Sequence, residues 1–136
     1  MIFVETSAIV AIMLNEPIAA ELVLAIEKSE QCLTGSHVRL EACMVLSSRQ
    51  NMLAAEVSSD LQKFLQRMKI SVLPFTDEIA LAAVLAFDKY GKGRNAKTAL
   101  NLADCMSYAF AKTRNLKILY TGTDFKGTDQ KCHNRR

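Results

Sequence analysis

Four acidic residues interrupt apolar segments of this 136-residue chain: Glu5, Glu41, Asp104 and Asp124. Glu5 separates the apolar run 1–4 from a second run at 8–14, and Asp104 is the sole charged residue of 98–111. Removing an ionised carboxylate from water costs several kcal/mol, on the order of the whole stability of a small domain, unless a cation compensates it. The sequence therefore predicts that these acids gather around a bound metal ion.

The chemistry of such a site follows from its donor atoms. Carboxylates without a Cys or His partner offer only oxygen ligands, which suit Mg²⁺ or Mn²⁺ and not zinc or copper. A cation held there can generate hydroxide, polarise a phosphoryl oxygen and stabilise a leaving alkoxide, so the set favours phosphodiester hydrolysis. Thr6 and Ser7 follow Glu5 directly. Either hydroxyl could be the N-cap of the next helix, or a supporting group that bonds a metal ligand or a phosphate.

Three of the acids also have an ordinary structural explanation. Asp104 could close a capping box opened by Asn101, three residues earlier. Asp124 could be a turn aspartate, and Glu41 could complement the dipole of a helix. Glu5, in an apolar environment with no basic neighbour in the sequence, has the weakest structural explanation. The joint placement of the four, and no single residue, favours a metal site.

Short apolar runs alternate with longer helical patterns along the chain. We expect strands at 2–5, 32–34, 70–75 and 117–121, and about six helices near 7–14, 17–28, 37–50, 53–68, 77–90 and 101–114. This alternation predicts an α/β fold whose parallel sheet is covered by helices on both faces. Ser36 and Thr76 are expected to cap helices, and Glu16 is assigned to a solvated face.

In a parallel sheet, the carboxyl ends of the strands and the first turns of the following helices share one edge, where ligand sites form. Glu5 and Asp124 follow the first and last expected strands, whereas Glu41 and Asp104 fall near the starts of helices. We therefore expect all four acids to face one rim.

Length and composition predict a single domain over residues 1–136. Half of the residues are hydrophobic and 23% are charged, with only 5 Gly and 2 Pro, which is typical of a helix-rich globular protein. No apolar run reaches the ~20 residues of a membrane span, and no signal peptide is evident, so we expect a cytoplasmic protein. The 4 cysteines are widely spaced and are expected to be reduced thiols. Serine-hydrolase and P-loop motifs are absent from the sequence.

Five blocks, in order across nearly the whole chain, resemble the PIN-domain ribonuclease toxins of VapC type. They are V-E-T-S-A at 4–8, L-E-A at 40–42, G-K-G-R at 91–94, L-N-L-A-D-C at 100–105 with S-Y-A at 107–109, and T-G-T-D-F at 121–125 with T-D at 128–129. The resemblance implies a three-layer α/β/α fold with a central parallel sheet of four to five strands. It also implies a Mg²⁺- or Mn²⁺-dependent endoribonuclease, the toxin of a type II toxin–antitoxin system, which forms a homodimer and is inhibited by a cognate VapB-like antitoxin.

Carried over by motif, Glu41, Asp104 and Asp124 are catalytic, metal-binding acids, and Thr6 or Ser7 is the supporting hydroxyl. Glu5 takes the fourth catalytic and metal-binding position, where the family normally has Asp in a V-D-T-S-A block. The basic loop residues Lys92 and Arg94 are expected to bind the RNA backbone or the antitoxin and to take no part in the chemistry.

The extra methylene of Glu5 leaves a second interpretation open, because metal–ligand distances tolerate only about 0.2 Å. The chain would then be a catalytically weakened PIN-fold module that keeps RNA or antitoxin binding. A receiver-like phospho-acceptor domain is disfavoured, since it would need an Asp at the end of the third strand, where this chain has Leu-Pro-Phe at 73–75.

Overall fold

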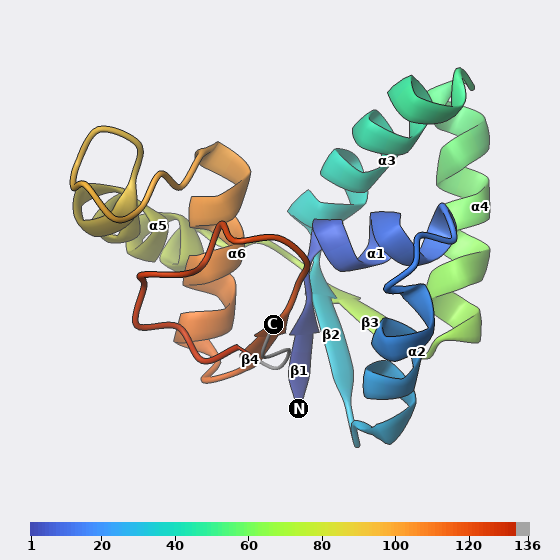
Figure 1. The fold of residues 1–136 in the computed structure, drawn as a ribbon, viewed down its shortest axis with the longest axis horizontal. Coiled ribbons are helices and arrows are strands. Elements are labelled where there is room, and N and C mark those ends of the chain that lie inside the picture. Colours follow the sequence, from blue (N-terminus) through green and yellow to red (C-terminus); the bar gives the residue numbers. More distant parts are fainter. Residues whose placement is uncertain (133–136) are drawn as a thin grey trace.

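The computed structural model describes residues 1–132, which form four strands and six helices in the alternating order expected (Figure 1). The strands are β1 (Ile2–Val4), β2 (Cys32–Gly35), β3 (Ile70–Leu73) and β4 (Lys117–Leu119). The helices are α1 (Thr6–Met13), α2 (Ala19–Lys28), α3 (Ser36–Gln50), α4 (Ala54–Arg67), α5 (Asp77–Tyr90) and α6 (Leu102–Thr113). β1, β3 and β4 end earlier than predicted, whereas β2 ends one residue later. β3 stops before Pro74, which has no N–H to donate to a neighbouring strand.

The sheet is parallel throughout, with the strand order β3-β2-β1-β4. Phe3 on β1 lies opposite Leu33 on β2 and Ile118 on β4. The chain builds β2 and β3 on one side of β1 and adds β4 on the other, so the strand order reverses at β1. Parallel α/β sheets bind ligands outside the carboxyl ends of strands at such a reversal, here between β1 and β4.

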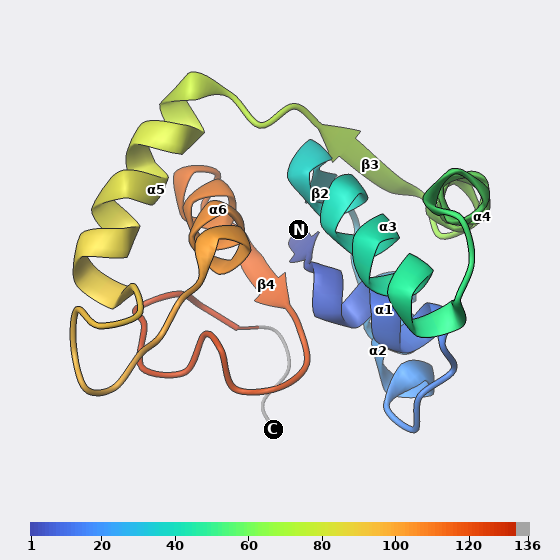
Figure 2. The same ribbon diagram turned by 90° about the horizontal axis from the view of Figure 1, so that it is seen from above.

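Helices cover both faces of the sheet, as the α/β prediction requires. Figure 2 shows α5 and α6 on one side and α1 and α2 on the other, while α3 lies beside α1 and, in Figure 1, rises beyond the carboxyl ends of the strands together with part of α4. The fold is thus the predicted α/β architecture, with four parallel strands.

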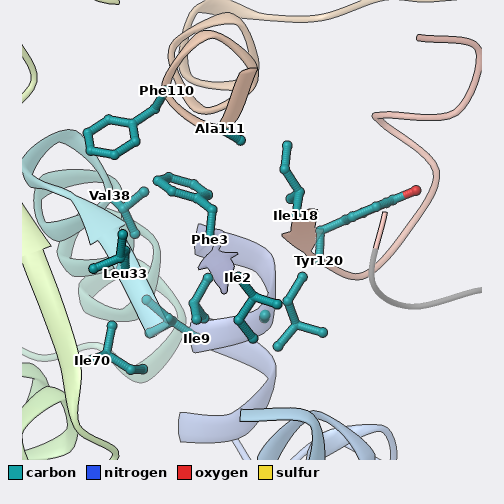
Figure 3. Close-up of a cluster of buried hydrophobic side chains, with 14 of the residues drawn as sticks. Ile2, Phe3, Ile9, Leu33, Val38, Ile70, Phe110, Ala111, Ile118 and Tyr120 are labelled. Atoms are coloured by element: carbon teal, nitrogen blue, oxygen red, sulfur yellow. The ribbon is translucent and has the colours of Figure 1, made fainter. Parts of the chain in front are cut away.

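The core is built around β1. Ile2, Phe3 and Val4 are each at most 2% exposed, because helices pack on both sides of this central strand. The Phe3 ring meets that of Phe110 on α6 at a centroid distance of 5.1 Å, and Ile9 of α1 lies on the other side (Figure 3). This packing fixes the end of β1, and with it the position of the next residue, Glu5.

The observed helix caps and first residues match the sequence predictions in part. Thr76 caps α5 as predicted, with its hydroxyl accepting from the Ile79 amide at 3.3 Å. The N-cap of α3 is Gly35, so the assignment to Ser36 is wrong. The Ser36 hydroxyl instead accepts a hydrogen bond from the Phe75 amide across the sheet edge, at 3.0 Å. The expected second helix begins at Ala19, two residues later than predicted.

Among the described residues no helix is long and apolar enough to span a bilayer. All four cysteines are free thiols, as predicted, and three of them are buried.

Candidate active site

A cavity of about 260 Å³ opens at the carboxyl edge of β1. It is bounded by the first turn of α1, one face of α3, the start of α6 and the loop after β4. All six residues predicted to form the acidic site line it: Glu5, Thr6, Ser7, Glu41, Asp104 and Asp124. The expectation that acids from distant parts of the chain meet at one rim is therefore confirmed.

Glu5 is held by the first turn of α1. It is the N-cap of that helix, so the assignment of the cap to Thr6 or Ser7 is wrong. Its Oε2 accepts hydrogen bonds from the Ser7 amide, at 2.8 Å, and from the Ser7 hydroxyl. The same hydroxyl oxygen accepts from the Thr121 amide at 2.9 Å, which joins the end of β1 to the loop after β4. Only 5% of Glu5 is exposed.

Glu41 is held by the other hydroxyl. Thr6 Oγ1 donates a short hydrogen bond to Glu41 Oε1, which links α1 to α3. Glu41 is half-buried, next to the fully buried Ala42, so it faces the cavity as its helical phase predicts. Each predicted supporting hydroxyl thus contacts one predicted metal-site carboxylate.

Asp104 closes a capping box at the start of α6. Its Oδ2 accepts from the Asn101 amide at 3.1 Å, and its own amide donates to Asn101 Oδ1 at 2.8 Å. The capping explanation is therefore confirmed, yet Asp104 also lines the cavity and is only 6% exposed. The two roles are compatible, because no hydrogen bond to Oδ1 occurs among the described residues and this oxygen is available to a ligand.

Asp124 lies in an exposed turn of the loop after β4. The loop is anchored by Phe125, which is 2% exposed, and by Asp129. Asp129 accepts hydrogen bonds from the Tyr108 hydroxyl and from Lys112 Nζ, the latter at 2.9 Å, so its carboxylate fastens the loop to α6. The turn explanation for Asp124 also holds, and again it does not conflict with a place in the cavity.

The buried carboxylates repel one another. Burial is the main cause that raises the pKa of Glu5 from 4.5 to about 7, and the charges of Glu41 and Asp104 add to it against the Ser7 hydrogen bonds. Burial likewise raises the pKa of Asp104 from 3.8 to about 6, with Asp124 and Glu41 contributing. No salt bridge to either carboxylate occurs in residues 1–132. The site is thus a concentration of negative charge that a cation would relieve.

The donor set fits a hard cation, since the acids and hydroxyls of the cavity supply oxygen alone. As they stand, however, no three His, Cys, Asp or Glu side chains of the described residues are grouped closely enough to hold a metal ion. Ser7 holds Glu5 at the start of α1, and the Thr6 hydroxyl of α1 holds Glu41 of α3, so hydrogen bonds within the protein occupy one oxygen of each carboxylate. The metal centre therefore stays a prediction.

The two basic loop residues lie outside this cavity. Arg94 Nη2 is 4.0 Å from Asp88 Oδ1, and its guanidinium stacks on the Phe87 ring at 4.6 Å, at the end of α5. Lys92 belongs to the same exposed loop. The RNA- or partner-binding role of both stays a prediction.

The cavity contains residues that the sequence analysis did not select. Glu16, assigned only to a solvated face, is partly exposed and lines the cavity, and Arg49 lies beside it. The signal for Arg49 was present in the sequence: Glu41, Val45 and Arg49 follow at intervals of four and so share one face of a helix.

Comparisons with known proteins agree with this geometry. Residues 2–131 match the PIN domain family. Ribonuclease VapC36 of Mycobacterium tuberculosis is 37% identical over 133 residues, covering 93% of this chain and 88% of that protein.

Solved structures share the fold. A crystal structure of Mycobacterium tuberculosis VapC20, described as a Sarcin-Ricin loop cleaving toxin, aligns with a TM-score of 0.73 at 16% identity, covering 96% of each chain. A chain of a structure described as a toxin-antitoxin complex from Klebsiella pneumoniae also shares the fold, with a TM-score of 0.70 at 15% identity, covering 95% of this chain and 93% of that one.

Proposed function

The chain belongs to the VapC ribonucleases of the PIN-domain family, and from this premise we propose that it is a metal-dependent endoribonuclease acting at the cavity beside β1. The substrate is RNA, the cofactor is Mg²⁺ or Mn²⁺, and residues 1–136 act as one PIN domain. The observation that carries the proposal is the meeting of four carboxylates in one cavity, two of them buried and without a basic partner among residues 1–132.

Glu5, Glu41, Asp104 and Asp124 would hold the metal. When bound, the ion would supply a nucleophile at neutral pH and stabilise charge on the phosphate and the leaving oxygen. The chain itself supplies orientation. Its hydroxyls and caps fix one oxygen of three carboxylates: Ser7 for Glu5, Thr6 for Glu41 and the Asn101 amide for Asp104.

The partners follow from the family and the neighbours of the fold. We propose that a cognate VapB-like antitoxin inhibits the protein, because a chain of this fold occurs in a toxin-antitoxin complex. We also propose a homodimer located in the cytoplasm. The apolar groove between α5 and α6, which includes Phe87 and Leu102, offers a surface for one of these associations.

The test is RNA cleavage by purified protein free of antitoxin, with Mg²⁺, with Mn²⁺ and with EDTA. We expect cleavage that EDTA abolishes. Asp104→Asn should abolish it too, while circular dichroism shows an intact fold, because Asn removes the charge and keeps the shape and hydrogen-bonding capacity of Asp104. Glu27→Gln, on the exposed face of α2, serves as the matched control.

Undiminished cleavage by the Asn variant would refute the site assignment. If the natural protein binds RNA but does not cleave it with either metal, the weakened binding module becomes the better description. Glu5 in the place of the family's Asp is the feature that would then explain the loss.

A further inference from the structure

The cavity continues beyond the four acids as a groove between two helices. One wall is α1, with Thr6 and Val10. The other is α3, where Glu41, Val45 and Arg49 follow at intervals of four residues and all line the groove. Eight residues of α-helix span about 12 Å, so Arg49 stands well outside the acid cluster along the same wall.

Arg49 brings a positive charge to a groove that is otherwise acidic. Among the described residues that line it, Arg49 is the single base, whereas five are acids: Glu5, Glu16, Glu41, Asp104 and Asp124. An RNA chain entering this groove is repelled along its length, except where a cation faces one of its phosphates.

The contact of Arg49 with Glu16 is weak, so the guanidinium of Arg49 is available to a ligand. Arg49 Nη1 is 3.5 Å from Glu16 Oε1, and the two side chains are 54% and 35% exposed. A single contact of this length between exposed groups contributes little. A guanidinium pairs much better with phosphate, through two parallel charge-assisted hydrogen bonds.

We propose that Arg49 binds an RNA backbone phosphate flanking the one that is cleaved, and that Glu16 holds the guanidinium until RNA displaces it. Arg49 is then a positioning residue that fixes the direction of the RNA along the α1–α3 groove. This inference rests on the proposed ribonuclease function and extends it by naming the groove through which the substrate passes.

The first experiment measures binding without cleavage. A fluorescein-labelled single-stranded oligoribonucleotide of mixed sequence is titrated in EDTA at several salt concentrations. The proteins are the natural chain, Arg49→Ala, Arg49→Lys, Glu16→Gln and the double variant of Arg49→Ala with Glu16→Gln. Arg39→Ala is the matched control, since Arg39 lies on the same helix, contacts Gln62 and does not line the groove.

Arg49→Ala should weaken binding roughly tenfold, or about 1.4 kcal/mol, and should lower the slope of log K against log salt by about 1. Arg49→Lys should keep most of the slope, because the charge remains. Glu16→Gln should tighten binding in the natural background and much less in the Arg49→Ala background, since its effect acts through the guanidinium. Arg39→Ala should have a much smaller effect than Arg49→Ala.

Equal losses in Arg39→Ala and Arg49→Ala would overturn the proposal, because the effect would then be one of general charge. An unchanged salt slope in Arg49→Ala would overturn it as well. Equal tightening by Glu16→Gln in both backgrounds would overturn the part assigned to Glu16. Arg49 is exposed, so these variants are expected to fold, and circular dichroism checks this.

The second experiment measures cleavage in Mg²⁺. Arg49→Ala should raise KM and leave kcat nearly unchanged, whereas Asp104→Asn removes kcat. A fall in kcat at constant KM would contradict a positioning role. The two proposals can fail separately. Absence of cleavage by the natural protein refutes the nuclease function but leaves the binding result in EDTA valid. Normal cleavage with a normal KM in Arg49→Ala refutes only the role of Arg49.

Discussion

Neutralising Glu5 should stabilise the metal-free protein at neutral and alkaline pH. Glu5→Gln removes a carboxylate that is 5% exposed and lies near two other acids, while keeping an oxygen that can accept from the Ser7 amide. Most core substitutions destabilise a protein. The opposite sign is expected here because the natural residue carries an uncompensated buried charge.

The size of the effect follows from the pKa. Burial and the neighbouring acids raise the pKa of Glu5 from 4.5 to about 7. One pKa unit corresponds to about 1.4 kcal/mol, so ionising Glu5 in the folded state costs about 3 kcal/mol. The gain from Glu5→Gln at pH 8 should approach this value, reduced by the weaker hydrogen bond that an amide oxygen accepts.

The direction with pH is fixed by the sign of the shift. A carboxyl with a raised pKa stabilises the fold fully below its unfolded pKa and loses that contribution as pH rises through its folded pKa. The difference in stability between Glu5→Gln and the natural protein should therefore grow from about pH 4.5 to about pH 7 and then level off. Asp104, with a pKa raised to about 6, adds to the decline of the natural protein in the same direction.

His37 acts in the opposite direction. Burial lowers its pKa from 6.5 to about 4, so it makes the fold more stable as pH rises through that range. The pH profile of the natural protein alone is therefore a mixture of opposing contributions. The difference between variant and natural protein cancels the His37 contribution and isolates Glu5.

The assay is urea denaturation in EDTA at pH values from about 4.5 to 8, with the free energy of unfolding taken from midpoint and slope. Glu27→Gln, an exposed change of the same chemistry, should give a flat difference. Adding Mg²⁺ at pH 8 should stabilise the natural protein more than Glu5→Gln, because the ion binds the folded site. A difference that is flat or falls with pH would refute the buried, uncompensated state of Glu5.

Three further outcomes are expected. Glu5→Asp should raise the cleavage rate at limiting Mg²⁺, because misplacement of a catalytic group by about 1 Å can cost ~100-fold in rate. Equal rates of the natural protein and the Asp variant at every Mg²⁺ concentration would show that the site is adapted to the longer side chain. Replacing Lys92 and Arg94 by Ala should weaken RNA binding about equally for all sequences and flatten its salt dependence, and an unchanged slope in a titration would assign the loop no phosphate contact. Asp129→Asn should loosen the loop that carries Asp124 and raise the Mg²⁺ concentration needed for half-maximal cleavage, with recovery at high Mg²⁺; loss that Mg²⁺ does not restore would contradict this.

The rim of acids could be predicted because it depends on topology alone. Glu5 and Asp124 are 119 positions apart in the sequence, yet each follows a strand, and β1 and β4 are neighbours in a parallel sheet. Hydrophobic runs reveal the strands, and the parallel arrangement brings their carboxyl ends together. The placement of the site required no knowledge of side-chain contacts.

The local contacts could not be predicted in the same way. Glutamate is not among the residues preferred at N-caps, so the sequence favoured Thr6 or Ser7 for α1. Glu5 caps the helix because it is buried and its carboxylate bonds to the Ser7 amide, and the sequence alone does not reveal this burial. The pairing of Glu16 with Arg49 depends on how the α1–α2 connection packs against the end of α3. The hydrophobic periodicity of the sequence does not predict the distance between these two side chains.

The capping role of Glu5 and Asp104 is compatible with the proposed metal site. A helix N-terminus offers amide donors and a positive dipole, so it holds a carboxylate by one oxygen and fixes its direction. Glu5 and Asp104 are both held in this way, at the starts of α1 and α6. α1 begins directly after β1, at the carboxyl edge of the sheet where ligands bind, and Asp104 at the start of α6 lines the same cavity. A carboxylate fixed there by one oxygen keeps its other oxygen for a ligand, so capping of this kind does not compete with the proposed metal site.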